Sequence, residues 1–193
     1  AFGADHPLFG LALLDAATLA LAQGRDAEAA ATLDRARALF DRRPEQPEAR
    51  GQCRLLLARA ALAQQRWPEA QAHLDAARAI LAPLGQTRAA ALARASTDAA
   101  QGTRYARQGF GQLAVVLLRR AVRAQQALLG EVNPIPAASL AELGRAYRQV
   151  GRPREAGQAL ARAEAIQRQT LGDSHPELAL TLRARAELDE VAH

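Results

Sequence analysis

The stretch GRPREAGQALARA (residues 151–163) decides the fold, because three other parts of the chain repeat its pattern. The matching stretches are GRDAEAAATLDRA (24–36), QRWPEAQAHLDAA (65–77) and GFGQLAVVLLRRA (109–121). Their equivalent alanines follow at spacings of 41, 44 and 42 residues, and they are Ala29, Ala70, Ala114 and Ala156. A period of about 42 residues is too long for a coiled-coil heptad and indicates an array of helix pairs.

Each repeat contains two helical patterns joined by a turn. A residue suited to a sharp helix terminus precedes each second pattern. These residues are Gly24, Gln65, Gly109 and Gly151. In the last repeat, apolar residues then recur at helical spacing and form one stripe. They are Ala156, Leu160, Ala163 and Ile166. Pro68 and Pro153 fall in the first turn of two second helices, where a missing N–H costs nothing.

The composition favours an all-α fold. The chain of 193 residues is 49% hydrophobic but only 4% aromatic, and its apolar residues are mostly the helix formers Ala and Leu. All 25 basic residues are Arg, which excludes Schiff-base and phosphate-loop lysines. Cys53 is the only cysteine, so the chain forms no internal disulfide. No apolar run approaches the ~20 residues that span a bilayer.

Three similar phrases mark expected helix starts: FGADHPLFGLAL (2–13), LGEVNPIPAASL (129–140) and LGDSHPELALTL (171–182). In the last phrase, Ser174 is expected to cap the helix while Glu177 reaches back to it. Asn133 is predicted to start a helix in the same way. His6 and His175 occupy equivalent positions, and we interpret both as helix-start residues rather than metal ligands.

The sequence resembles a known repeat family. The residues that carry the resemblance are Leu143, Gly144, Tyr147, Gly151, Ala156 and Ala163, in the order of the tetratricopeptide repeat. The period of about 42 residues, with L-G-x-x-H-P between repeats, resembles the kinesin-light-chain type. The resemblance covers essentially the whole chain and implies an all-α fold. The implied architecture is a right-handed α-solenoid of antiparallel helix pairs, with about four repeats and a C-terminal capping helix.

We expect a single repeat domain, and a piece of a longer protein because the chain starts at Ala rather than Met. The predicted divisions are residues 2–45, 46–86, 87–132, 133–173 and 174–193. The predicted helices are residues 6–22, 26–41, 48–64, 67–82, 87–107, 110–129, 135–149, 153–170 and 175–190. Small residues at recurring positions are expected to let these helices approach closely. They are Ala17, Ala29, Ala36, Ala58, Ala70, Ala77, Ala114, Ala121, Ala156 and Ala163.

The sequence carries no recognisable pattern of enzyme chemistry. It contains no HExxH, paired cysteines, Cys/His cluster, GxSxG, phosphate-loop or dinucleotide motif. We therefore predict no catalytic residue, no cofactor and no metal, and we interpret the chain as not an enzyme. Cys53 is expected to be buried or half-buried and inert, and His73 to be a surface imidazole.

The resemblance implies that the first helix of each pair lines a concave groove in which ligands lie. The peptide-binding residues predicted on this basis are Leu14, Thr18, Leu55, Arg59, Leu62, Thr103, Arg107, Arg145, Arg148, Gln149 and Arg183. The groove is therefore expected to be apolar at its N-terminal end and Arg-rich at its C-terminal end, where an Arg fork suits a carboxylate or phosphate. Alternatively, these arginines are only the solvated stripe of amphipathic helices.

The charge distribution favours an acidic partner. Residues 76–130 contain eight arginines and one acid, Asp98, a net charge of +7, while the whole chain carries +5. Such a belt attracts acidic proteins or peptides over a distance. Nucleic acid is a weaker alternative, because Tyr105 and Phe110 are the only aromatic residues in this stretch. We predict no membrane partner.

We therefore predict a protein–protein interaction or scaffolding module that binds a peptide or partner segment. One alternative is a sensor or regulatory domain of a signalling protein, such as a Ser/Thr kinase or transcription regulator, from a bacterium as the Ala, Arg and Leu bias favours. Another is a homodimer formed through the apolar N-terminal helix, which contains Leu8, Phe9, Leu11, Leu13 and Leu14. The compartment is unknown; the lone cysteine favours the cytoplasm.

Overall fold

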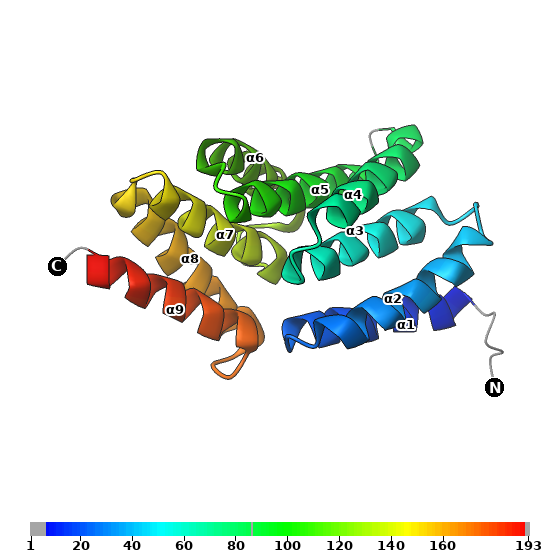
Figure 1. The fold of residues 1–193 in the computed structure, drawn as a ribbon, viewed down its shortest axis with the longest axis horizontal. Coiled ribbons are helices and arrows are strands. Elements are labelled where there is room, and N and C mark those ends of the chain that lie inside the picture. Colours follow the sequence, from blue (N-terminus) through cyan, green and yellow to red (C-terminus); the bar gives the residue numbers. More distant parts are fainter. Residues whose placement is uncertain (1–6, 86, 192–193) are drawn as a thin grey trace. The chain divides into compact units, whose positions relative to one another are not determined.

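The computed structural model describes residues 7–85 and 87–191 (Figure 1). Within them the chain is all-α, with nine α-helices, one short 3-10 helix and no β-strand. The elements are α1 (Pro7–Ala22), α2 (Asp26–Asp41), α3 (Pro47–Ala63), α4 (Trp67–Leu81), η1 (Ala82–Leu84), α5 (Arg88–Arg107), α6 (Gly111–Leu129), α7 (Pro134–Gln149), α8 (Pro153–Leu171) and α9 (Pro176–Val191). Every α-helix begins and ends within one residue of its predicted bounds, so the helix prediction is confirmed.

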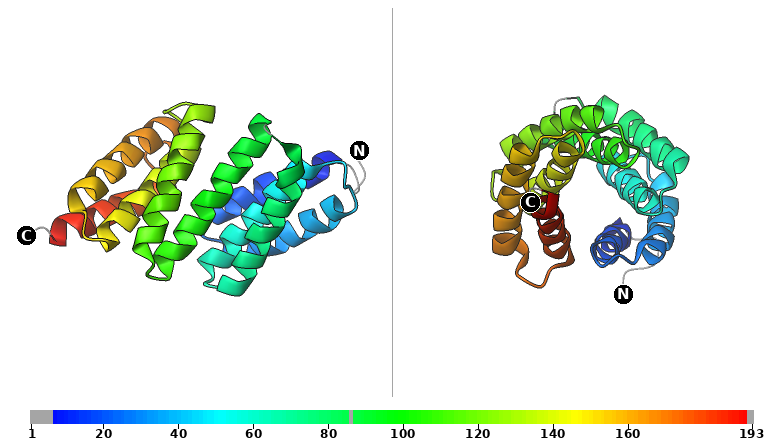
Figure 2. Two further views of the ribbon diagram at one scale, coloured as in Figure 1. Left: turned by 90° about the horizontal axis from the view of Figure 1, so that it is seen from above. Right: turned by 60° about the vertical axis from the view of Figure 1, so that its left-hand side comes forward.

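The chain divides into two compact halves, Ala1–Ala100 and Gln101–His193, with the division inside α5. In the N-terminal half, α1 packs on α2, α2 on α3 and α3 on α4. In the C-terminal half, α6 packs on α7, α7 on α8 and α8 on α9. Neighbouring helices in each half run antiparallel (Figures 1 and 2). The predicted antiparallel helix pairs are therefore present in both halves.

Small side chains hold the helix pairs together. The ten alanines that the repeat pattern places between helices all have an exposed fraction of 0%, as predicted. Two glycines add to this close packing. A Cβ on Gly51 would lie 2.5 Å from Leu81, and one on Gly144 would lie 2.6 Å from Leu160. The recurring small residues thus have a structural role, because larger side chains at these positions would push the helices apart.

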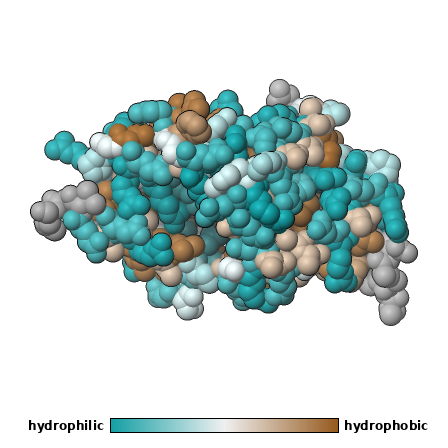
Figure 3. Space-filling view, in the orientation of Figure 1, coloured by the Kyte–Doolittle hydropathy of each residue, from teal (hydrophilic) through white to brown (hydrophobic). Residues whose placement is uncertain are grey.

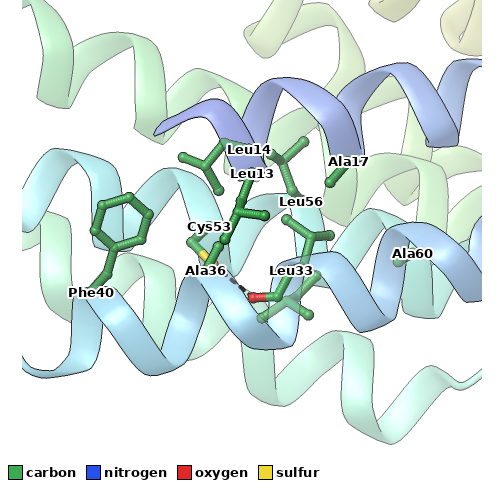
Figure 4. Close-up of a cluster of buried hydrophobic side chains, with 10 residues drawn as sticks. Leu13, Leu14, Ala17, Leu33, Ala36, Phe40, Cys53, Leu56 and Ala60 are labelled. Carbon is green, nitrogen blue, oxygen red and sulfur yellow. Dashed lines mark hydrogen bonds between the residues drawn. The ribbon is translucent and has the colours of Figure 1, made fainter. Parts of the chain in front are cut away.

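A buried cluster in the N-terminal half contains the lone cysteine (Figure 4). Cys53 lies among Leu33, Phe40 and Leu56, and its thiol donates to the carbonyl oxygen of Leu33 at 3.5 Å. Burial raises the pKa of the Cys53 thiol to about 12, and the nearby Arg54 only partly opposes this. Cys53 is therefore buried, as predicted, and it stays a thiol at neutral pH.

At the predicted turns between helices, the backbone adopts the left-handed conformation that favours glycine. Gly24, Gly109 and Gly151 have φ values of 71°, 86° and 72°, and Gln65 has a φ of 57° at the equivalent turn. This left-handed region costs an ordinary residue roughly 1–2 kcal/mol, while glycine adopts it freely. The turn prediction is confirmed, and Gln65 is the position at which this turn is strained.

The structure confirms the predicted cap of α7 and corrects the predicted cap of α9. Asn133 caps α7, since its side-chain oxygen accepts from the N–H of Ile135 at 3.0 Å. The predicted cap at Ser174 is wrong, because α9 begins at Pro176 and the residue before it is His175. The Nδ1 atom of His175 accepts from the N–H of Glu177 at 3.2 Å. The helix-start role of His175 is thus confirmed, while the equivalent His6 lies outside the described residues.

Candidate functional site

The three leucines predicted to line the apolar end of the groove lie in the core of the N-terminal half. Leu14, Leu55 and Leu62 have exposed fractions of 1%, 8% and 3%. Leu14 packs in the cluster with Cys53, and the other two pack in a second cluster with Leu74. Their apolar surface is therefore already covered by the chain itself, and it offers a partner little to bury.

The other predicted residues of the N-terminal half and of α5 are more accessible. Thr18 and Arg59 are exposed, although the hydroxyl of Thr18 donates to the carbonyl oxygen of Leu14 at 2.8 Å. On α5, Arg107 is exposed and Thr103 is half-buried.

The predicted arginines of α7 and α9 come together in the C-terminal half. A nitrogen of the Arg148 guanidinium lies 2.7 Å from a carboxylate oxygen of Glu187. The Nε atom of Arg183 donates to the other oxygen of the same carboxylate at 3.1 Å. Two guanidinium groups from different helices thus hold one carboxylate, which we call the α7–α9 arginine site. Arg145 lies beside it and donates to the carbonyl oxygen of Leu180 at 3.3 Å.

The electrostatics of this site favour an ionised carboxylate. Hydrogen bonds from Arg148, and secondarily from Arg183, lower the pKa of Glu187 from its usual 4.5. Glu187 and Arg148 are both partly exposed, with side-chain exposed fractions of 37% and 34%. The site is therefore a charged surface that solvent and a partner can reach, and not a closed ion pair.

Two further side chains of α7 are engaged nearby. Arg145 also pairs with Glu142 of its own helix at 2.7 Å. Gln149 is exposed, and its amide donates to the carbonyl oxygen of Ala106 on α5 at 2.9 Å. Gln149 therefore ties α7 to the end of α5, and the predicted binding role of its side chain competes with this structural one.

Sequence reasoning missed the buried carboxylate of Glu164. It lies on α8 and accepts hydrogen bonds from Arg168 on the same helix and from Arg185 on α9. A buried carboxylate is stable only when it is paired in this way. The spacing of Glu164 and Arg168 by four residues was the one signal in the sequence, and Arg185 gave none. The contact holds α9 against α8 and so supports the arginine site.

A metal site and a membrane span were two further possibilities for the described residues. Among the described residues, no group of three or more His, Cys, Asp or Glu side chains could hold a metal ion. No helix in the same residues is long and apolar enough to cross a membrane. His73 is half-buried rather than fully at the surface. Burial, with help from Arg54, lowers the pKa of His73 from 6.5, against the opposing effect of Glu69.

Comparison with known proteins agrees with this architecture. A sequence model of the tetratricopeptide repeat matches residues 94–169. A crystal structure described as Podosopora anserina putative kinesin light chain nearly identical TPR-like repeats is similar, with a TM-score of 0.62 and 27% identity over 97% of this chain and 88% of that one. Residues 94–169 thus resemble the tetratricopeptide repeat, and the fold of the chain is similar to that of TPR-like repeats. A variant of the same Podosopora anserina repeats, in which one glutamine is replaced by methionine, is 26% identical, with a TM-score of 0.62 over 100% of this chain and 89% of that one.

The comparison with curated proteins found no match. The match to the tetratricopeptide repeat nevertheless indicates a general kind of function. Tetratricopeptide repeat proteins generally mediate protein–protein interactions or scaffolding, and they are typically not enzymes. Their extended repeat surfaces bind proteins or peptides. The arginine site lies on helices α7 and α9, which are the first helices of the fourth repeat and of the terminal segment.

Proposed function

We propose that this protein binds a peptide or partner segment through the α7–α9 arginine site. The observation that supports the proposal is the convergence of Arg148 and Arg183 on one carboxylate. Guanidinium groups bind carboxylates through charge-assisted hydrogen bonds, which orient the ligand as well as attract it. Glu187 occupies the position that an acidic side chain or a C-terminal carboxylate of a partner takes when it binds.

Competition with Glu187 sets the specificity of this site. A neutral ligand cannot replace the carboxylate without leaving the arginines unpaired. A partner with a carboxylate replaces one ion pair with another and adds its own contacts to α7 and α9. The proposed ligand is therefore an acidic peptide, and removal of the internal carboxylate makes its binding tighter.

The experiment uses a displayed library of random peptides, selected on the intact chain. Affinities of the enriched peptides are then measured for the wild type, for Arg148→Gln/Arg183→Gln and for Glu187→Gln. The matched control is Arg154→Gln/Arg162→Gln, which removes the same charge from α8 of the same half. The expected result is a loss of at least about tenfold in the first variant, equivalent to about 1.4 kcal/mol, and tighter binding by Glu187→Gln. Equal losses in the first variant and in the control would contradict the proposal.

A second candidate function is self-association through α1. Leu11 and Leu19 are exposed on this helix, with exposed fractions of 41% and 55%. Light scattering across a concentration series tests it, and a strict monomer at every concentration would rule it out. The predicted sensor role, the bacterial source and the cytoplasmic location are not supported by any feature of the two halves, and they stay predictions.

A further inference from the structure

The outer face of α6 carries both apolar and basic side chains that are exposed. One face of α6 packs in the core through Ala114, Leu118 and Ala121, which are all fully buried. The opposite face carries Leu113 and Val116, with exposed fractions of 52% and 64%. In Figure 3 the visible surface is mainly hydrophilic with separate apolar patches, one of them at the upper edge where Figure 1 draws α6.

Basic side chains continue the same face toward the C-terminal end of α6. Leu113, Val116, Arg120 and Arg123 are spaced by three, four and three residues and therefore share one side of the helix. Arg119 lies next to them, and all three arginines are exposed. The face is thus apolar over its first two turns and basic over the next two. We call it the α6 outer face.

The basic end lacks acidic neighbours along the chain. Residues 99–130 contain no Asp or Glu. Within the described part of the chain, Arg119 and Arg123 form no ion pair with an acidic residue. The next repeat is different, because Arg152, directly before α8, pairs with Glu155, and Arg162 on α8 pairs with Glu131. The positive charge of Arg119 and Arg123 is therefore available to neutralise charge on another molecule.

The surface also has a recess. A shallow depression of about 630 Å³ runs along the basic end, lined by Val116, Arg119, Arg120, Arg123 and Ala124. It begins at the last exposed apolar residue, so an apolar side chain and an acidic side chain of one ligand can occupy neighbouring parts of it. Val116 and Arg123 are seven residues apart, or about 10 Å along the helix axis.

We propose that the α6 outer face docks an acidic, amphipathic segment of a partner protein. Apolar side chains of that segment cover Leu113 and Val116, and its carboxylates pair with Arg119 and Arg123. Burial of the two apolar side chains supplies affinity, while the arginines fix direction along the helix. The contacting residues of α6 recur at helical spacing, so a helical segment of the partner can pack along them.

A protein segment fits this face better than other acidic macromolecules. Single-stranded nucleic acid binds through stacking on aromatic rings, whereas the exposed apolar residues of this face, Leu113 and Val116, are aliphatic. An interfacial membrane helix presents an apolar face along its whole length, whereas here the apolar and basic residues occupy opposite ends. A linear segment with an apolar end and an acidic end matches this division.

The test is a second selection of random displayed peptides of about 15 residues, or four helical turns. Peptides are selected on the intact Arg148→Gln/Arg183→Gln variant, so that the α7–α9 arginine site does not contribute. Anisotropy at physiological ionic strength, about 0.15 M, then compares three variants: Arg119→Glu/Arg123→Glu, Leu113→Ser/Val116→Ser, and the matched control Arg154→Glu/Arg162→Glu. Phosphatidylserine vesicles and oligothymidylate are measured as alternative ligands.

The expected result is a set of acidic peptides with apolar residues, whose affinity falls at least about tenfold in both α6 variants and is retained in the control. Equal losses in the control would show that only net charge matters, and would overturn the proposal. Tight binding to vesicles or oligothymidylate without binding to acidic peptides would overturn it as well. An absence of enriched peptides would do the same. Circular dichroism of each variant identifies any loss of fold.

Discussion

The carboxylate of Glu187 reports directly on the α7–α9 arginine site. It accepts hydrogen bonds from Arg148 and Arg183, and these contacts lower its pKa. Because the folded-state pKa is lowered, this contact stabilises the fold above the ordinary pKa of 4.5 and is lost as the pH falls through the lower folded value. The site is therefore fully formed at neutral pH.

We predict that Arg148→Gln raises the pKa of Glu187 toward 4.5, because the largest cause of the shift is removed. Carbon-detected NMR titration of the side-chain carboxyl measures it. Glu155 is an internal control, since Arg152 lowers its pKa through a separate contact. An unchanged Glu187 pKa, or an equal change at Glu155, would contradict the geometry of the site.

At the level of single residues, the repeat determines which positions the sequence predicts. The ten small residues were predictable because the period places them at equivalent contacts. The binding role of Leu55 and Leu62 was a weaker inference, because α3 packs against α1, α2 and α4. A helix with neighbours on several sides buries side chains that a simple two-sided pattern assigns to a free face. The pairing of Arg148 with Glu187 spans 39 residues, which local spacing cannot reveal.

At the scale of helices, one repeat position near the C-terminal ends of the second helices is apolar in α2 and α4 and polar in α6 and α8. The repeat aligns Phe40, Leu81, Gln125 and Gln167, and all four side chains have an exposed fraction of 1%. In the described part of the C-terminal half, the side-chain oxygens of Gln125 and Gln167 are buried without a hydrogen-bond partner. A buried unsatisfied carbonyl costs roughly 1–3 kcal/mol.

We predict that Gln125→Met and Gln167→Met each stabilise the chain by about 1 kcal/mol, because methionine keeps the unbranched shape and removes the unsatisfied oxygen. Urea unfolding followed by circular dichroism measures the free energy. The reverse change, Leu81→Gln, is the control and lowers stability. A loss of stability in both methionine variants would show that the glutamine oxygens have partners.

Helix boundaries were predictable to within one residue, but the capping atom of α9 was not. Ser174 and His175 are adjacent, and both side chains can accept from a backbone N–H. Because α9 begins at Pro176, the residue before the helix is His175. The predicted helix began one residue earlier, and the predicted cap therefore fell on Ser174.

At the scale of the whole molecule, half-buried His73 and buried Cys53 make the stability depend on pH. His73 has a lowered pKa because of burial and Arg54, so the unfolded chain takes up a proton near 6.5 before the folded chain does. Stability is therefore lost as the pH falls below 6.5. Cys53 has a pKa raised to about 12, so the unfolded chain releases its proton near 9.0 first. Stability is therefore lost as the pH rises above 9.0.

We predict that the free energy of unfolding is highest between these two pH limits. His73 causes the decline on the acid side, and Cys53 causes the decline on the alkaline side. Urea unfolding at a series of pH values measures the curve. His73→Gln flattens the decline on the acid side, and Cys53→Ala flattens the decline on the alkaline side, where an uncompensated thiol contributes about 1.4 kcal/mol per pH unit. A Cys53→Ala curve parallel to that of the wild type would contradict the prediction.

The antiparallel packing of neighbouring helices also bears on how the protein is made. In each half, the well-packed pairs join helices that are adjacent or next but one along the chain. Such a chain has a low contact order, and its contacts form after short loop closures. Because the ribosome releases the N-terminus first, α1 and α2 can close on each other while α4 is still being translated. Synthesis and folding can therefore proceed together, one helix behind the other, with little apolar surface waiting for a distant partner.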